Sequence, residues 1–394
     1  MTAECSTVYN GVSNSVDVNS NDLGTDAWGR NKTVSDVSLF HGMFTYSVPQ
    51  QMWLEYINGA EQTAFSGFTS ANGRLKIQGT NGQSNLLMSK RHPRYQPNRG
   101  HLYSTAMILP DAANAVNQEF GLFHAQAGVF FRINAGVLYA VRRTIIDGTI
   151  VNTAETITLP AGIDLTKGNV YDIQMQWRGV GNIKFFINLQ LVHTMEILGR
   201  LSEVSIWNPA LPIAFNIDGV ATMYCGCVDA TSEGGQRENR QRGSVDSEEV
   251  TLSTAETPVL LMRSANTVLY NGVNVMNTRD IALRRISGYS DAATIVKMYY
   301  TRDSSKFTGT TWTNDDTEGF VQYSIDGNIT LVGGTTGLDR QITRRIAAND
   351  SLEVVNPDNQ LGDFYLTHGD YVLITMTAKN STLGGAAMEW GAEV

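Results

Sequence analysis

The sequence is poor in charged residues, and its net charge is negative. Only 17% of its 394 residues are Asp, Glu, Lys or Arg, against roughly 25% in ordinary soluble domains. Its surface must therefore be covered largely by Asn, Thr, Ser, Gln and Gly. The formal net charge of -9 argues against a general nucleic-acid binder, which would present a basic surface.

Cysteine and long apolar runs are also scarce. Cys5, Cys225 and Cys227 make an odd total, which argues against a disulfide framework. One residue between Cys225 and Cys227 is not the spacing of a redox pair or half a zinc site, so we interpret these thiols as buried or half-buried. No run approaches the roughly 20 apolar residues of a membrane span, and no signal peptide is recognisable at the N-terminus. We therefore expect no membrane partner.

What the sequence has instead is short segments in which apolar and polar residues alternate. Residues 171–177 alternate in this way, a glycine-containing turn follows, and residues 183–187 alternate again. Such a pair predicts a β-hairpin. Residues 128–133 and 137–141 predict a second hairpin around Asn134-Ala135-Gly136. Recurrence of this pattern predicts an all-β sandwich or jelly roll.

Composition divides the chain into four regions. Residues 1–24 are interpreted as an extended arm, with terminal disorder as the alternative. Residues 25–228 are predicted to form the first β-sandwich, and residues 229–255 are polar and charged, which is typical of a linker or loop. Residues 256–394 are predicted to form a second, smaller β-sandwich with apolar runs at 258–262, 293–300 and 371–376, although its segment 341–347 could carry a helical turn.

A search for catalytic side chains finds no constellation. A retaining glycosidase needs two carboxylates about 5–5.5 Å apart, which on a strand means acids two or four residues apart. Asp172 shares its strand face with Gln174 and Gln176, so no such pair is present there. None of the six histidines lies in a recognisable nucleophile motif. We therefore predict no catalytic residue and a protein that is not an enzyme.

Metal and stacking candidates are few. The acidic turn 315–319 could hold calcium through oxygen ligands, but we favour a solvated loop, and we predict no metal and no cofactor. Trp312 lies among Thr, Gly and Asn residues. Its ring could stack on a sugar or on a partner protein, or it could pack over the second sandwich.

One stretch is basic in this acidic chain. Residues 89–100 read SKRHPRYQPNRG, and Lys90, Arg91, Arg94 and Arg99 supply the charge. The footprint is too small for nucleic acid, and two prolines predict an edge strand or an extended crossing segment. The four side chains are either a solvated edge or a contact with an acidic face of another subunit, and we carry them as candidate subunit-contact residues.

Several segments together resemble a family of largely uncharacterised virion proteins of tailed bacteriophages. The stretches that carry the resemblance are 26–30 (DAWGR), 94–97 (RYQP), 120–131 (FGLFHAQAGVFF), 177–185 (WRGVGNIKF), 208–212 (NPALP) and 232–235 (SEGG). The resemblance covers about residues 25–240 and implies a concanavalin-like β-sandwich in an accessory head, neck, tail or fibre protein. It implies no reaction and no catalytic residue.

These observations predict a non-enzymatic virion structural protein, such as a capsid decoration, neck, tail-associated or fibre component, that binds other virion subunits. By analogy with three-fold fibres we expect a homo-oligomer, a trimer being one form. The expected location is the virion, after assembly in the host cytoplasm. The alternative is a glycan-binding fibre module for adsorption to host surface glycans, and a third reading is a polysaccharide-degrading enzyme.

Overall fold

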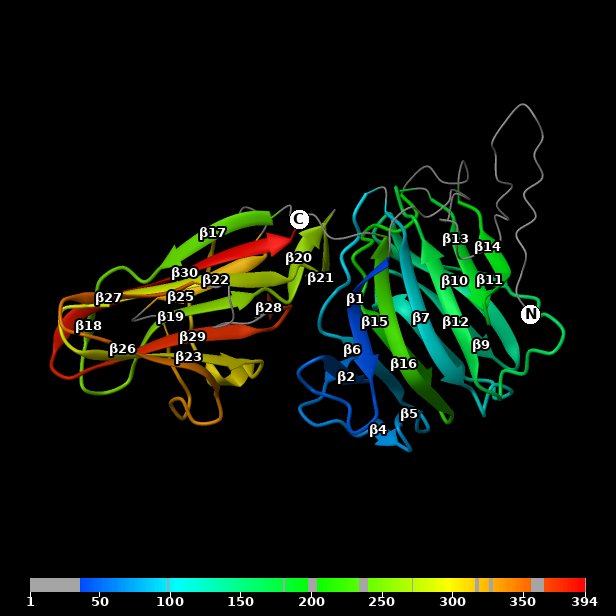
Figure 1. Ribbon diagram of the computed structural model, residues 1–394, viewed down its shortest axis with the longest axis horizontal. Coiled ribbons are helices and arrows are strands. Elements are labelled where there is room, and N and C mark those ends of the chain that lie inside the picture. Colours follow the sequence, from blue (N-terminus) through cyan, green and yellow to red (C-terminus); the bar gives the residue numbers. More distant parts are fainter. Residues whose placement is uncertain are drawn as a thin grey trace, which may run out of the picture. The chain divides into compact units, whose positions relative to one another are not determined.

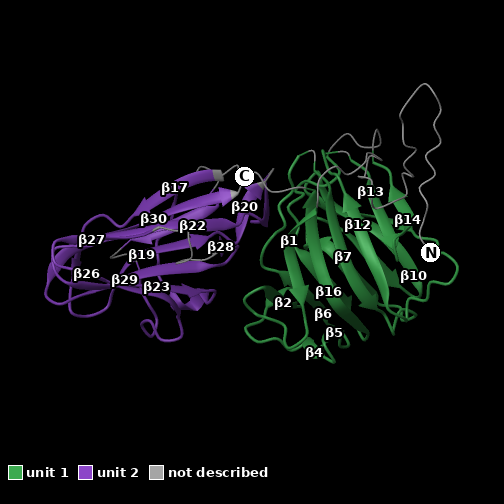
Figure 2. Ribbon diagram, in the orientation of Figure 1, with its two compact units in different colours: residues 1–236 green, residues 237–394 purple. Residues whose placement is uncertain are grey.

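The protein is seen here as a computed structural model, which divides the chain into two compact units, residues 1–236 and 237–394 (Figures 1 and 2). The residues described are 36–97, 99–179, 181–197, 204–233, 240–270, 272–315, 319–325, 329–355 and 365–393. The predicted arm at 1–24 lies outside them. Regular structure within these ranges is β, apart from a 3-10 turn at Ser304–Lys306. No helix in them is long and apolar enough to cross a membrane.

Unit 1 is a sandwich of two eight-stranded sheets, which confirms the predicted all-β, jelly-roll or concanavalin-like class (Figure 1). The β7 sheet has the order β14 (Gln190–Met195), β13 (Ile183–Ile187), β12 (Asn169–Met175), β7 (His101–Ile108), β16 (Thr222–Glu233), β5 (Arg74–Gln78) and β4 (Phe68–Ala71), with β1 (Asp36–Met43) also pairing with β16. The β8 sheet has the order β11 (Thr149–Thr156), β10 (Val137–Ile146), β9 (Gly128–Asn134), β8 (Asn117–Phe123), β15 (Ile213–Asp218), β6 (Ser84–Ser89), β2 (Trp53–Ile57) and β3 (Ala60–Glu61).

The core between these sheets is aromatic. Tyr171 projects from the β7 sheet and meets Phe120 and Phe131 of the β8 sheet, with ring centroids 5.0 Å and 5.3 Å away. Phe185 of β13 meets Phe131 edge-on at 5.0 Å. Each such aromatic pair stabilises the core by about 0.5–1.5 kcal/mol beyond the contribution of the apolar area that it buries. Both predicted hairpins are confirmed, as β12–β13 and β9–β10.

Unit 2 is a second sandwich with two six-stranded sheets. The β22 sheet has the order β17 (Arg240–Asp246), β30 (Thr382–Glu393), β22 (Ile281–Ser290) and β27 (Asp350–Val355), with β18 (Val250–Leu252) beside β30 and β28 (Tyr365–Leu366) beside β22. The β19 sheet has the order β24 (Thr313–Asn314), β25 (Val321–Ile325), β19 (Thr257–Ser264), β29 (Tyr371–Ala378), β23 (Thr294–Thr301) and β26 (Asp339–Ile346). A separate hairpin joins β20 (Thr267–Tyr270) and β21 (Val273–Met276).

Two sequence interpretations differ from the structure. The polar region 229–255 contains the end of β16, β17 and β18, and the two units divide at residue 236 within it. Small residues explain this: Ala230 and Ser232 are buried while Asp229 and Thr231 are partly exposed, so the strand alternates without large apolar side chains. The prediction of a helical turn at 341–347 is wrong, because residues 341–346 belong to β26, which pairs with β23.

Candidate functional site

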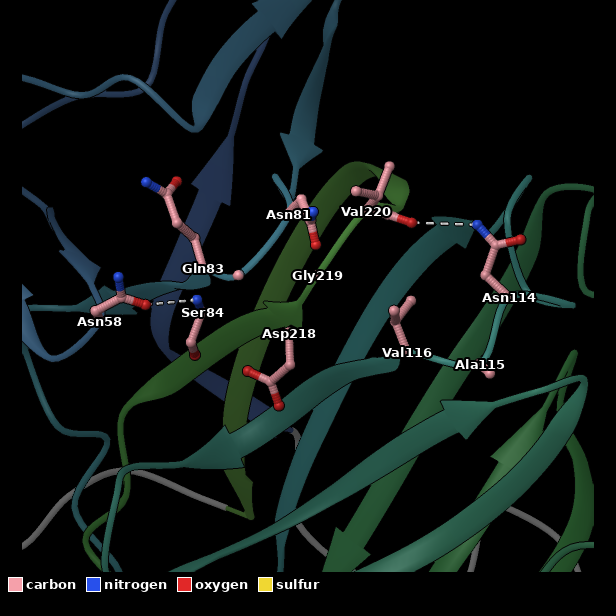
Figure 3. A pocket seen from close by; sticks show the side chains of 11 residues that line it. Asn58, Asn81, Gln83, Ser84, Asn114, Ala115, Val116, Asp218, Gly219 and Val220 are labelled. Carbon is pink, nitrogen blue, oxygen red and sulfur yellow. Dashed lines mark hydrogen bonds between the residues drawn. The ribbon is translucent and has the colours of Figure 1, made fainter.

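Four chain connections meet at one end of unit 1 and enclose an open pocket of about 740 Å³ (Figure 3). They are the β2–β3, β5–β6, β7–β8 and β15–β16 connections. The volume lies within the roughly 300–1,000 Å³ range of small-molecule sites. Four of the eleven lining residues carry amide side chains; the lining consists of Asn58, Asn81, Gly82, Gln83, Ser84, Asn114, Ala115, Val116, Asp218, Gly219 and Val220.

The β2–β3 turn is fixed against the pocket by Asn58 and Gly59. Their φ angles are +50° and +80°, as a tight Asn-Gly hairpin turn requires. The Asn58 N–H donates to the Ser84 carbonyl at 2.9 Å, and the Ser84 N–H donates to Asn58 Oδ1 at 2.9 Å. This reciprocal pair uses the Oδ1 atom and leaves Asn58 Nδ2 available.

The β5–β6 and β15–β16 connections approach so closely that one position must be glycine. A Cβ on Gly79 would lie 2.0 Å from the carbonyl oxygen of Gly219. The Gly79 N–H donates to Ala221 O at 2.9 Å, and the Gly219 N–H donates to Gln83 O at 2.9 Å. A backbone this close admits no side chain, so the relative position of the two connections is built into the fold.

Asp218, at the end of β15, is the charged side chain of the pocket. Asn216 Nδ2 donates to Asp218 Oδ1 at 3.0 Å and lies 3.2 Å from Glu119 Oε2. Asn117 Nδ2 donates to the other Asp218 oxygen at 3.4 Å. Glu119 is only 3% exposed and pairs with Arg132 at 2.7 Å. These contacts orient the Asp218 carboxylate from behind.

Several polar atoms of the pocket have no partner within the described residues. Asn81 makes no hydrogen bond through its side chain, while Asn114 uses only Nδ2, which donates to Val220 O at 3.2 Å. Gln83 Oε1 accepts from the Thr80 hydroxyl, which leaves Nε2 unused. Figure 3 shows Asn58, Asn81 and Gln83 on one side and Val116 on the other. Such a site offers amide donors and acceptors opposite an apolar wall.

The basic residues predicted from sequence are brought together but are not an exposed patch. Lys90, Arg91, Arg94 and Arg99 are each half-buried in the crossing segment that leads from β6 to β7. Arg99 donates to the Glu233 carbonyl at 2.7 Å, and the other three also interact within the chain. Tyr95, between them, packs on the Trp177 ring at 5.6 Å. Their role as subunit contacts stays a prediction.

Trp312 packs on unit 2 rather than standing free. The Arg263 guanidinium lies 3.9 Å from its ring centroid, and Tyr371 is 5.9 Å away. Its role in stacking on a ligand stays a prediction. In the acidic turn, Asp315 accepts a hydrogen bond from Trp390 Nε1, and residues 316–318 lie outside the described part of the chain.

The cysteines differ from one another. Cys225 is buried and lies 3.3 Å from Thr105 Oγ1, and burial raises the pKa of its thiol to about 12. Cys227 is exposed, because it lies where a bulge interrupts the pairing of β16 with β7. The prediction of a buried thiol is confirmed for Cys225 and is wrong for Cys227, and Cys5 lies outside the described residues.

The β7 sheet also places two acidic residues from different strands on one face. Asp172 and Asp229 both register opposite Ser104, from β12 and β16 on either side of β7. Burial raises the pKa of Asp172, and a hydrogen bond from Ser104 opposes that shift. Asp172 is only 2% exposed, however, and Asp229 accepts from Ser38 at 2.6 Å. The pocket is therefore the more accessible site.

Sequence reasoning missed every residue of the pocket. Asn58-Gly59 and Asn81-Gly82 are recognisable as turns, and that was the available signal. Which turns share one end of the sandwich depends on strand order, which no local pattern reveals.

No family model matches the chain, and no curated protein matches it. Solved structures do. They include endo-1,3-beta-glucanase from Streptomyces sioyaensis, with 13% identity and a TM-score of 0.40 over 50% of this chain and 96% of that one. Endo-beta-1,3-glucanase from Pyrococcus furiosus matches with 14% identity and a TM-score of 0.39 over 50% and 95%. A structure described with endo-acting O-glycanases of human gut microbiota that initiate mucin breakdown matches with 14% identity and a TM-score of 0.38 over 50% and 99%.

This comparison contradicts two sequence predictions. A non-enzymatic virion structural protein is wrong as the main function, because the similar solved structures are glycan-cleaving enzymes and no virion component is among those described here. The prediction that the chain is not an enzyme is contradicted by the same structures, which are described as glucanases and O-glycanases. Its physical basis was incomplete: acids were sought along single strands, whereas Asp172 and Asp229 share a sheet face from two strands. Oligomeric state and location stay predictions.

Proposed function

We propose that unit 1 is a glycan-binding domain and that the amide-lined pocket is its ligand site. The observation that carries this proposal is the set of unused polar atoms on Asn58, Asn81, Gln83 and Asn114, four residues that line one open pocket of about 740 Å³. Sugar hydroxyls both donate and accept, and a primary amide does the same through its two ends. The pocket matches that chemistry from several directions.

The apolar side of the pocket supports the same ligand. Val116 and Val220 contribute methyl groups, and Val220 is 59% exposed. A pyranose ring has an apolar C–H face beside its hydroxyl edge, so one ring can satisfy both walls. Convergent polar groups beside apolar surface are the usual composition of a small-molecule site. The turns that hold the amides are fixed by backbone hydrogen bonds, so little ordering is needed on binding.

The test is an oligosaccharide array followed by calorimetry on the full chain and on Asn81→Ala combined with Gln83→Ala. Each lost hydrogen bond is worth about 0.5–1.5 kcal/mol, so we expect the double variant to bind at least about tenfold more weakly. Asn380→Ala with Gln341→Ala is the matched control, since both residues are exposed in unit 2.

Two results would count against the proposal. One is the absence of any bound glycan across the array, and the other is binding that the pocket variant leaves unchanged. The same incubations should be assayed for new reducing ends. Glycan cleavage that persists in the pocket variant and disappears in Asp172→Asn would instead place a catalytic site on the sheet face shared by Asp172 and Asp229.

A further inference from the structure

Asp218 is the charged residue among the eleven that line the pocket, and no Lys, Arg or His is among them. We infer that the pocket selects neutral sugars and discriminates against sugars that carry a carboxylate or sulfate. This inference rests on the proposed function, because it names the class of glycan that the same site takes. Figure 3 shows Asp218 between Ser84 and Val116, with its carboxylate pointing away from Asn81 and Val220.

The negative charge of Asp218 is not cancelled by a paired cation. The two hydrogen bonds that its carboxylate accepts come from the neutral amides of Asn216 and Asn117. The nearby cation to consider is Arg143. The Asp218 carboxylate raises the pKa of Arg143, but Glu119 raises that pKa more. Arg143 Nη2 lies 3.7 Å from Glu119, and its other groups donate to the His124 carbonyl and to Asn152.

A like charge in the same pocket is therefore repelled. Two negative charges a few ångströms apart near a protein surface interact strongly enough to change affinity by about tenfold or more. A hydroxyl at the same position can instead donate to the Asp218 carboxylate, which makes a charge-assisted hydrogen bond. The same residue thus favours the neutral sugar and penalises the acidic one.

The apolar wall fits a ring rather than a charged chain. Gly219 carries no Cβ, and an added one would lie 2.8 Å from Val116 Cγ1. Val116 therefore occupies the room that a side chain at 219 would fill, next to exposed Val220. Burying these methyls against the C–H face of a pyranose is favourable, whereas burying a carboxylate there would be costly.

The experiment compares matched sugars that differ in one group. The probes are the methyl glycosides of glucose, galactose and mannose, each beside its uronate, which carries a carboxylate at C6. Binding to the full chain is measured by NMR titration. For the sugar that binds best, we expect the neutral form to bind about tenfold more tightly than its uronate. In Asp218→Asn this ratio should fall to about twofold.

Asp147→Asn is the matched control. It removes the same charge from the β10–β11 turn, where φ is +48°, a conformation that Asn tolerates. Its neutral-to-uronate ratio should equal that of the wild type. Should Asp218→Asn fail to fold, raising salt from about 50 mM to about 500 mM on the wild type should narrow the ratio, since salt screens the repulsion.

The outcomes separate the two proposals. A ratio that stays the same in folded Asp218→Asn, or that is near one in the wild type, overturns the inference about neutral sugars. If sugar binding is still weakened in Asn81→Ala combined with Gln83→Ala, the glycan site itself stands. Sugar binding that this double variant leaves unchanged overturns the glycan site and the inference together.

Discussion

Glu256 of unit 2 and the pocket amides of unit 1 differ in whether the protein itself satisfies their polar atoms. In unit 2, Glu256 accepts from Lys297 and Tyr299 at 2.8 Å each and from Thr375 at 2.6 Å. In the pocket of unit 1, Asn81 has no hydrogen-bond partner among the described residues. A group that the protein has already satisfied gains little from a ligand, whereas an unused donor or acceptor at the mouth of a pocket can gain a full hydrogen bond.

The difference teaches where to look for binding in a β-sandwich. Both units contain many Asn, Asp, Thr and Tyr side chains, so composition alone does not separate them. What separates the Glu256 network from the pocket amides is whether the polar groups are used within the fold. The Glu256 network stabilises unit 2, and the unused amides in unit 1 form the proposed ligand site.

The largest expected effect is on unit 2. Asp370 accepts from Tyr300 OH and from the Thr367 N–H, at 2.8 Å and 2.7 Å, and also pairs with Arg302. Asp370→Ala leaves the largely buried Arg302 without this partner, which typically costs about 3–5 kcal/mol. Calorimetric scans should show unit 2 melting earlier while glycan binding is kept. Asp291→Ala, on the exposed surface, should leave both unchanged, and lost binding in Asp370→Ala would break the separation of roles.

Acid should unfold unit 1 before unit 2. Burial lowers the pKa of His101 to about 4 and of His124 to about 3, so protons bind the unfolded chain more readily. The contribution of these neutral histidines to the free energy of unfolding of unit 1 is fully present above pH 6.5, the ordinary histidine pKa. It falls as the pH drops towards 4. The loss is about 3 kcal/mol from His101 alone.

In unit 2, burial raises the pKa of Glu256, but hydrogen bonds from Lys297, Thr375 and Tyr299 outweigh it and the net pKa is lowered. Its contribution is present above the ordinary glutamate pKa and is lost only as the pH falls further. Unfolding midpoints between pH 7.5 and 4 check this order. A unit 1 midpoint that is flat over that range would contradict it.

A smaller effect is expected from Gly79→Ala. The new Cβ would overlap the Gly219 carbonyl, and such overpacking costs about 1–3 kcal/mol. Because the two connections must separate, the glycan affinity should fall with the stability of unit 1. Gly168→Ala is the control, since its Cβ would lie 3.8 Å from Ile108, an ordinary contact. An unfolding midpoint equal to that of the wild type would show that the connections are not held as described.

Local patterns predicted the strands well. The alternation in 171–177 and 183–187 reports which side chains enter the core, and the structure buries Tyr171, Ile173 and Phe185 as that alternation requires. Patterns failed where small or polar residues form a strand, as in β17. They also mistook β26, where Ile342 and Ile346 are spaced as on a helix but pair along β23.

The site could not be predicted in the same way. Asn58 and Val220 are far apart in the sequence, and they meet because β15 pairs with β6 and β6 with β2. The same holds for Asp172 and Asp229, which share a face only because β7 lies between their strands. Strand order is a property of the whole sheet, so residues from different connections had no local signal to join them.

The most direct test of the central claim is hydrogen–deuterium exchange on the full chain with and without a saturating neutral oligosaccharide. Protection should appear in the connections that carry Asn58, Asn81–Ser84, Asn114–Val116 and Asp218–Val220, and unit 2 should be unchanged. Protection around Trp312, or no protection at the pocket despite measured binding, would contradict the account.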